Sequence, residues 1–163
     1  SSKTALKQVD EVITALINGG VTIRTLWIQV TSPLSWNKNT ATNFNFIKSA
    51  TDRVRARGIR PGVYTNSYDW QQITANSNKL PTDVMLWYWS VYGSGNGGES
   101  PPNFDDFRTF GSWISASVKQ MGQNEIVCGI VVNRDVYPRV SVATKEMNKS
   151  AVDNRIYVGS IGL

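Results

Sequence analysis

Apolar side chains recur at helical spacing in three stretches of the chain. This pattern predicts helices over residues 5–17, 42–57 and 68–74. We expect Ser2 to cap the first helix and Ser67 or Asp69 to cap the third, because these side chains can accept a hydrogen bond from a backbone N–H. Gly19-Gly20 and Gly58 are expected to end the first and second helices.

Short apolar runs between and after these helices predict strands. The predicted strands cover residues 26–30, 62–65, 84–89, 118–121, 126–132 and 156–158. A turn over residues 122–124 should join the fourth and fifth, the Gly- and Pro-rich residues 93–103 should form a surface loop, and residues 142–148 resemble a weak helix. Because strands alternate with helices, we expect an α/β fold with a mainly parallel sheet.

In a β/α barrel, the active site lies at the carboxyl ends of the strands. The candidate positions there are Gln29, Thr31, Tyr64, Thr65, Tyr88, Ser90 and Asn133. The chain contains no His, which excludes imidazole chemistry. Its single cysteine, Cys128, excludes an internal disulfide and a Cys-based zinc site, and its apolar neighbours predict a buried thiol.

The net charge of the chain excludes few classes of binding partner. Lys and Arg number 17 against 12 Asp and Glu, a net charge of +5 that suits cell-wall polymer, nucleic acid or a membrane surface. Four arginines, at positions 53, 55, 57 and 60, are interpreted as a solvated helix end. No apolar run approaches the roughly 18 residues of a membrane span, so we expect a soluble chain. It begins with Ser1 and shows no signal peptide, which suggests a processed product or a fragment.

Five segments, in order, resemble the motifs of glycoside hydrolase family 25 lysozymes of the invertebrate type. They extend over about residues 5–138, which we take as one domain, and leave residues 139–163 outside. The segments are Leu26-Trp27-Ile28-Gln29-Val30-Thr31 with Trp36, Gly62-Val63-Tyr64-Thr65 with Trp70, Leu86-Trp87-Tyr88-Trp89-Ser90-Val91-Tyr92, Phe110-Gly111-Ser112-Trp113 with Lys119-Gln120, and Cys128-Gly129 through Asn133-Arg134-Asp135 to Tyr137-Pro138.

The resemblance implies an irregular TIM-like β/α barrel. It also implies a secreted protein of antibacterial defence that cleaves the muramic acid–glucosamine linkage of peptidoglycan, with no cofactor and no metal. The family's domain begins well upstream of Ser1, so we expect only the C-terminal portion of the barrel here. The sequence leaves the oligomeric state open.

The family's catalytic acids have no counterpart at the matching positions. Its Asp matches Gln29, its Glu matches Thr31, and its late Asp matches Asn133. Glycoside hydrolysis needs a proton donor and a carboxylate that stabilises or traps the sugar carbon. Amide side chains do not act as acids or bases near neutral pH, and the hydroxyl of Thr31 is far too weak an acid. We therefore expect a lysozyme-like protein that binds glycan at most.

Two alternatives stay open. An active lysozyme could use Asp69 or Asp135 as substitute acids. The basic helix end could bind nucleic acid, although no motif supports that. By the resemblance, the expected partner is peptidoglycan or a related glycan, with neither nucleic acid nor membrane. The residues expected to bind it are Tyr64, Trp87, Tyr88, Trp36 and Asp135.

Overall fold

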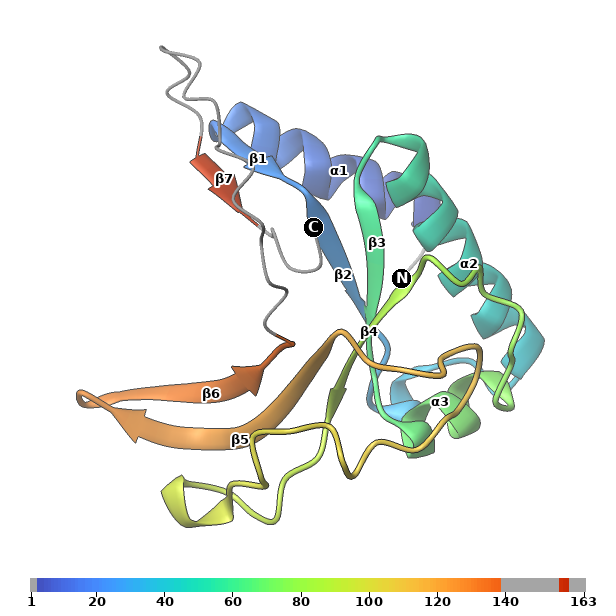
Figure 1. Cartoon of the computed structure of the whole chain (residues 1–163). Helices are drawn as coiled ribbons and strands as arrows, with labels where there is room; N and C mark the ends of the chain where they lie inside the picture. The colour runs from blue at the N-terminus through green and yellow to red at the C-terminus, as the bar shows by residue number, and fades with distance from the viewer. Residues whose placement is uncertain (1–2, 139–155, 159–163) are drawn as a thin grey trace.

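Five strands form one curled, open sheet in the computed structural model, which describes residues 3–138 and 156–158 (Figure 1). The first four strands run parallel in chain order, and the last lies antiparallel at the edge. This half-barrel confirms the predicted α/β class and the incomplete β/α barrel. The strands are β2 (Thr25–Gln29), β3 (Arg60–Tyr64), β4 (Met85–Trp89), β5 (Val118–Val127) and β6 (Ile130–Val136).

Three helices follow the predicted pattern: α1 (Ala5–Asn18), α2 (Thr40–Ala56) and α3 (Ser67–Thr74). Their caps differ from the prediction. Thr4, Asn39 and Asn66 each accept a hydrogen bond from the backbone N–H three residues on, so the predicted caps Ser2 and Ser67 or Asp69 were wrong. The predicted glycine stops are confirmed, since Gly20 and Gly58 have φ angles of 75° and 73°.

The hairpin of β5 and β6 differs most from the prediction. Residues 122–124 do not turn the chain; they lie within β5, where the pairing with β6 shifts register on either side of Gly122. The turn lies at Cys128 and Gly129, whose φ angles are 51° and 78°. Cys128 is therefore exposed, and the prediction of a buried thiol was wrong.

Two buried clusters lie between the sheet and the helices. One joins α2 and α3 to the centre of the sheet through Val63, Leu86 and Tyr88, and the other joins α1 to α2. All three helices therefore pack on the same side of the sheet, on side chains that alternate along its strands. Among the described residues, no helix is both long and apolar enough to cross a membrane.

Smaller elements complete the described fold. β1 (Val21–Ile23) pairs in parallel with β7 (Ile156–Val158), which confirms the last predicted strand. β1 itself was not predicted from the sequence. Short 3-10 helices η1 (Pro33–Ser35) and η2 (Asn96–Gly98) lie in the loops after β2 and β4. The helix predicted over residues 142–148 lies outside the described residues.

The Trp27 ring lies directly over Gly62 on the neighbouring strand. A Cβ atom at Gly62 would lie 2.3 Å from Trp27 Cε3, closer than real Cβ contacts allow. Glycine is therefore needed at this position of β3, and it determines where the Trp27 indole lies on the sheet.

Replacing Gly62 with Ala should lower the free energy of unfolding by about 1–3 kcal/mol, because the added methyl group overlaps the Trp27 ring. Urea unfolding followed by circular dichroism measures this change. Gly97→Ala is the matched control, since a Cβ there meets no atom within 4 Å. An equal loss in both variants would contradict the packing constraint.

Candidate functional site

Side chains from all five strands gather on the face of the sheet opposite the helices. Because successive residues of a strand point to opposite faces, the burial of Leu86 and Tyr88 under the helices directs Trp87 and Trp89 to the other face. The strand register continues this alternation across the sheet. We call this surface the inner face and define it by Trp27, Gln29, Tyr64, Trp87, Trp89, Gln120 and Asp135.

Four aromatic rings form a continuous row on the inner face. The ring centroids of Trp27 and Trp87 lie 5.6 Å apart, those of Trp87 and Tyr64 4.7 Å, and those of Tyr64 and Trp89 5.1 Å. The first two contacts are edge-to-face, which suits the ring quadrupoles. All four side chains stay partly exposed. The row therefore offers apolar surface on which the apolar face of a sugar ring can stack.

Two separate sets of hydrogen bonds between neutral groups include the three positions that match the family's acids. The Gln29 amide donates to Thr31 Oγ1 at 3.0 Å at the end of β2. On the same face, toward the edge formed by β6, the Asn133 amide donates a hydrogen bond at 3.5 Å to Gln120 Oε1. The same Gln120 oxygen also accepts a hydrogen bond from the Tyr64 hydroxyl at 2.9 Å. Amides do not exchange protons near neutral pH. This network can orient a bound group but cannot act as an acid–base pair.

Two carboxylates lie near the Tyr64 hydroxyl. Asp135 on β6 accepts a 2.9 Å hydrogen bond from Trp87 Nε1. Burial by surrounding protein atoms raises its pKa, and the hydrogen bond from Trp87 opposes that shift. Asp69 in the first turn of α3 is buried, which raises its pKa, while the backbone N–H of Ser32 lowers it.

The Tyr64 phenol responds to both carboxylates. Burial contributes most to raising its pKa, and the negative charges of Asp135 and Asp69 raise it further. Asp69 and Asp135, the two substitute acids considered from the sequence, therefore both act on one hydroxyl at the carboxyl end of β3. Neither forms a salt bridge with the residues that the structure describes.

Tyr88, predicted to bind glycan, lies on the opposite face of the sheet. It is buried in the core beneath the helices, and its hydroxyl donates to Asp106 at 2.8 Å. Burial raises its pKa strongly, and the hydrogen bond to Asp106 adds to that shift. Asp106 in turn pairs at 3.0 Å with Lys119, whose side chain is fully buried. Tyr88 therefore belongs to a structural network and does not line the inner face.

Trp36 lies in the loop after β2 and supports that loop. Its indole N–H donates to the carbonyl of Thr31 at 2.9 Å, and its ring packs edge-to-face on Phe46 of α2. Thr65 is buried, and the carbonyl of Ser90 accepts a hydrogen bond from the Ser100 hydroxyl. Of these three predicted positions, none contributes to the aromatic row.

Two residues of the inner face were missed from the sequence: Trp27 and Gln120. The alternation of a strand groups Trp89 with Trp87, and it equally places Trp27 on the same face as Gln29, two residues later. This spacing could have identified Trp27. Gln120 could not be found in the same way, because its position depends on the pairing of β5 with β4.

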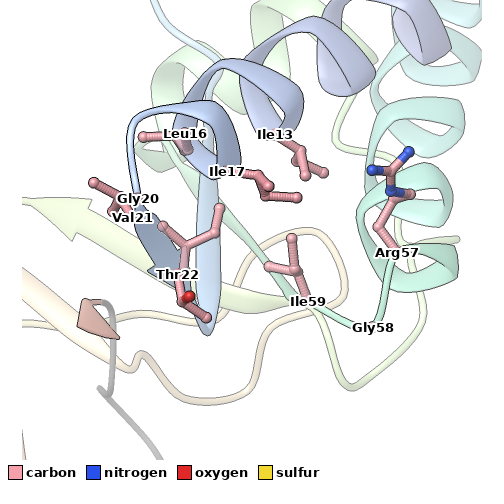
Figure 2. Close-up of a pocket in the computed structure, with 10 residues that line it drawn as sticks. Ile13, Leu16, Ile17, Gly20, Val21, Thr22, Arg57, Gly58 and Ile59 are labelled. Atoms are coloured by element: carbon pink, nitrogen blue, oxygen red, sulfur yellow. The ribbon is translucent and has the colours of Figure 1, made fainter. Parts of the chain in front are cut away.

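A cavity of about 520 Å³ lies at the other end of the molecule, between the end of α1, β1 and the turn after α2 (Figure 2). The described residues that line it are mostly aliphatic and include no carboxylate or amide side chain. Arg57 at its rim pairs with Asp10 at 3.1 Å. This cavity therefore provides apolar surface without groups for catalysis.

The basic cluster on α2 is engaged within the chain. Arg53 makes two 2.9 Å hydrogen bonds to Asp10, and Arg55 makes hydrogen bonds of 2.8 and 2.7 Å to Asp83. The hydrogen bond from Arg53 is the largest effect that holds the pKa of Asp10 below its usual range. Paired arginines are poorly suited to phosphate binding, which supports the interpretation as a helix end.

Comparison with known proteins identifies the family. The family model described as Lysozyme-like protein 1 matches residues 1–121. The chain belongs to the lysozyme-like protein family. Lysozyme-like protein 7 of Caenorhabditis elegans is 48% identical over 98% of this chain, and Lysozyme-like protein 1 of the same organism is 53% identical over 84%.

The lysozyme-like family is related to the glycoside hydrolase family 25 lysozymes, as the motifs predicted. A Dictyostelium discoideum protein described as Probable GH family 25 lysozyme 2 is 29% identical over 69% of the chain. The chain spans about half the length of these relatives: 55%, 46% and 49% of the three proteins named. No solved structure gives a significant match.

The hydrogen bond from Tyr64 to Gln120 provides a test of the inner face of this lysozyme-like chain. Tyr64→Phe should lower the free energy of unfolding by about 0.5–1.5 kcal/mol, because the buried Gln120 oxygen loses its 2.9 Å donor. Urea unfolding measures the loss. Tyr68→Phe is the control, since Tyr68 is 65% exposed. A Tyr64→Phe variant as stable as the control would show that the network contributes nothing.

Proposed function

We propose that the inner face binds a glycan strand of the bacterial cell wall and that Gln29, Thr31 and Asn133 do not hydrolyse it. The observation that carries this proposal is the partly exposed row of Trp27, Trp87, Tyr64 and Trp89, with neutral amide and hydroxyl groups at the positions that match the acids. Family membership supports a glycan as the ligand. Secretion and a role in antibacterial defence belong to the same proposal.

Two kinds of contact would hold the glycan. The indole and phenol rings would stack on sugar faces, and the exposed Gln29 and Asn133 would exchange hydrogen bonds with sugar hydroxyl and acetamido groups. These side chains already have partners on the protein. A ligand would therefore meet polar groups whose orientation is set in advance, which reduces the entropy lost on binding.

A second function, hydrolysis, is favoured by one specific observation. Asp69 and Asp135 both have raised pKa values, and both act on Tyr64 at the carboxyl end of β3. A raised pKa suits a carboxyl group that must donate a proton near neutral pH. Buried Asp69 is the better candidate for the acid, since water screens its charge less than that of Asp135.

Trp87→Ala should weaken binding of N-acetylglucosamine oligomers about tenfold or more, because it removes the ring that contacts both Trp27 and Tyr64. Isothermal titration calorimetry measures the affinity. Tyr92→Ala is the control, since Tyr92 is 77% exposed and lies outside the row. Equal affinity in both variants would contradict binding at the inner face.

A cell-wall assay separates binding from hydrolysis. The chain should bind insoluble peptidoglycan in a pull-down without clearing a cell-wall suspension or releasing reducing ends. Clearing at the rate of a normal lysozyme would contradict the proposal and favour the second function. In that case Asp69→Asn or Asp135→Asn should reduce the rate by about 10² to 10⁴-fold. If both variants matched the parent, these two carboxylates would have no catalytic role.

A further inference from the structure

Asp135 lies beside Trp87 of the aromatic row and forms no salt bridge with the described part of the chain. Trp87 Nε1 holds its Oδ1 atom at 2.9 Å, and no described residue donates a hydrogen bond to its other oxygen. Basic residues nearby in the sheet are occupied elsewhere, since Arg134 pairs with Glu99 and Glu125, and Lys119 pairs with Asp106. A negative charge is therefore available beside the indole of Trp87.

This combination of groups suits an ammonium ion better than a neutral ligand. A carboxylate accepts strong, charge-assisted hydrogen bonds from an ammonium group. The faces of Trp and Tyr rings attract cations through their quadrupoles. Trp87 contacts Tyr64 at 4.7 Å while its N–H holds Asp135, so the carboxylate and the rings adjoin one another. Of the residues that define the inner face, Asp135 is charged and none is basic.

We propose that the inner face prefers glycans whose glucosamine units carry free, protonated amines over fully N-acetylated ones. Asp135 accepts hydrogen bonds from the ammonium group, and the rings of Trp87 and Tyr64 bind the adjacent sugar. This inference rests on the proposed glycan binding and specifies its ligand. The net charge of +5 repels a cationic oligomer, so a preference for one arises from the local arrangement and not from overall charge.

An ammonium group of the cell wall has two sources, an amino sugar or a lysine side chain in the peptide stem. The aromatic row favours the sugar, because three further rings extend from Trp87 over the neighbouring strands and can bind successive sugar units. A lysine side chain would occupy only the position beside Asp135. A free stem peptide is therefore included as a separate ligand in the test.

Calorimetry at pH 6 tests the preference with three ligands: a glucosamine hexamer, an N-acetylglucosamine hexamer and a lysine-containing stem peptide. We expect the amine hexamer to bind at least about fivefold more tightly than the acetylated one. Asp135→Asn should remove that difference, because the amide keeps an acceptor for Trp87 Nε1 but carries no charge for the ammonium group. Asp105→Asn removes the same charge from an exposed loop position and should keep the preference.

Each remaining outcome contradicts a distinct claim. Equal, measurable binding of both hexamers would overturn the amine preference and leave glycan binding intact. A preference that survives in Asp135→Asn, or disappears equally in Asp105→Asn, would show that Asp135 is not the acceptor. Tighter binding of the stem peptide than of the amine hexamer would make the lysine amine the ligand. Binding of none of the three would overturn the proposed function as well.

Discussion

The burial of alternate strand residues under α2 and α3 is the constraint on which the inner face depends. Val63, Leu86 and Tyr88 are buried against the helices, and this fixes which way each strand faces. Their neighbours Tyr64 and Trp87 then have only the other face available. The aromatic row is thus a consequence of core packing, and its spacing follows from strand pairing and from the absence of a side chain at Gly62.

The neutral groups of the inner face hold one another in fixed positions. Gln29 bonds to Thr31, while Gln120 accepts from both Tyr64 and Asn133. Carboxylates at such positions would repel one another and would need protons or cations nearby, whereas amides and hydroxyls satisfy each other directly. Such hydrogen bonds form without a ligand, and they present donors and acceptors in fixed orientations to a ligand that binds. This arrangement suits binding of a glycan better than its hydrolysis.

The sequence predicted the helices and the parallel strands because their apolar periods are long and regular. The prediction of caps and turns failed where the same residue types suit two different local structures. Asn66 and its neighbour Ser67 are both good cap residues, and Gly122 suits a bulge as well as a turn, so only the register of β5 with β6 moves the turn to Cys128. For the site, the alternation of side chains along β4 places Tyr88 on one face of the sheet and Trp87 and Trp89 on the other. Only the position of the helices decides which of these two faces is covered and which is open.

The central claim is that the inner face, and not the helix side, binds glycan. Nuclear magnetic resonance of the indole N–H groups tests it directly, because the tryptophans lie on both sides of the sheet. Titration with N-acetylglucosamine oligomers should shift the indole signals of Trp27, Trp87 and Trp89 and leave those of buried Trp70 and Trp113 unchanged. Shifts confined to Trp70 and Trp113, or no shift at saturating oligomer, would contradict the account.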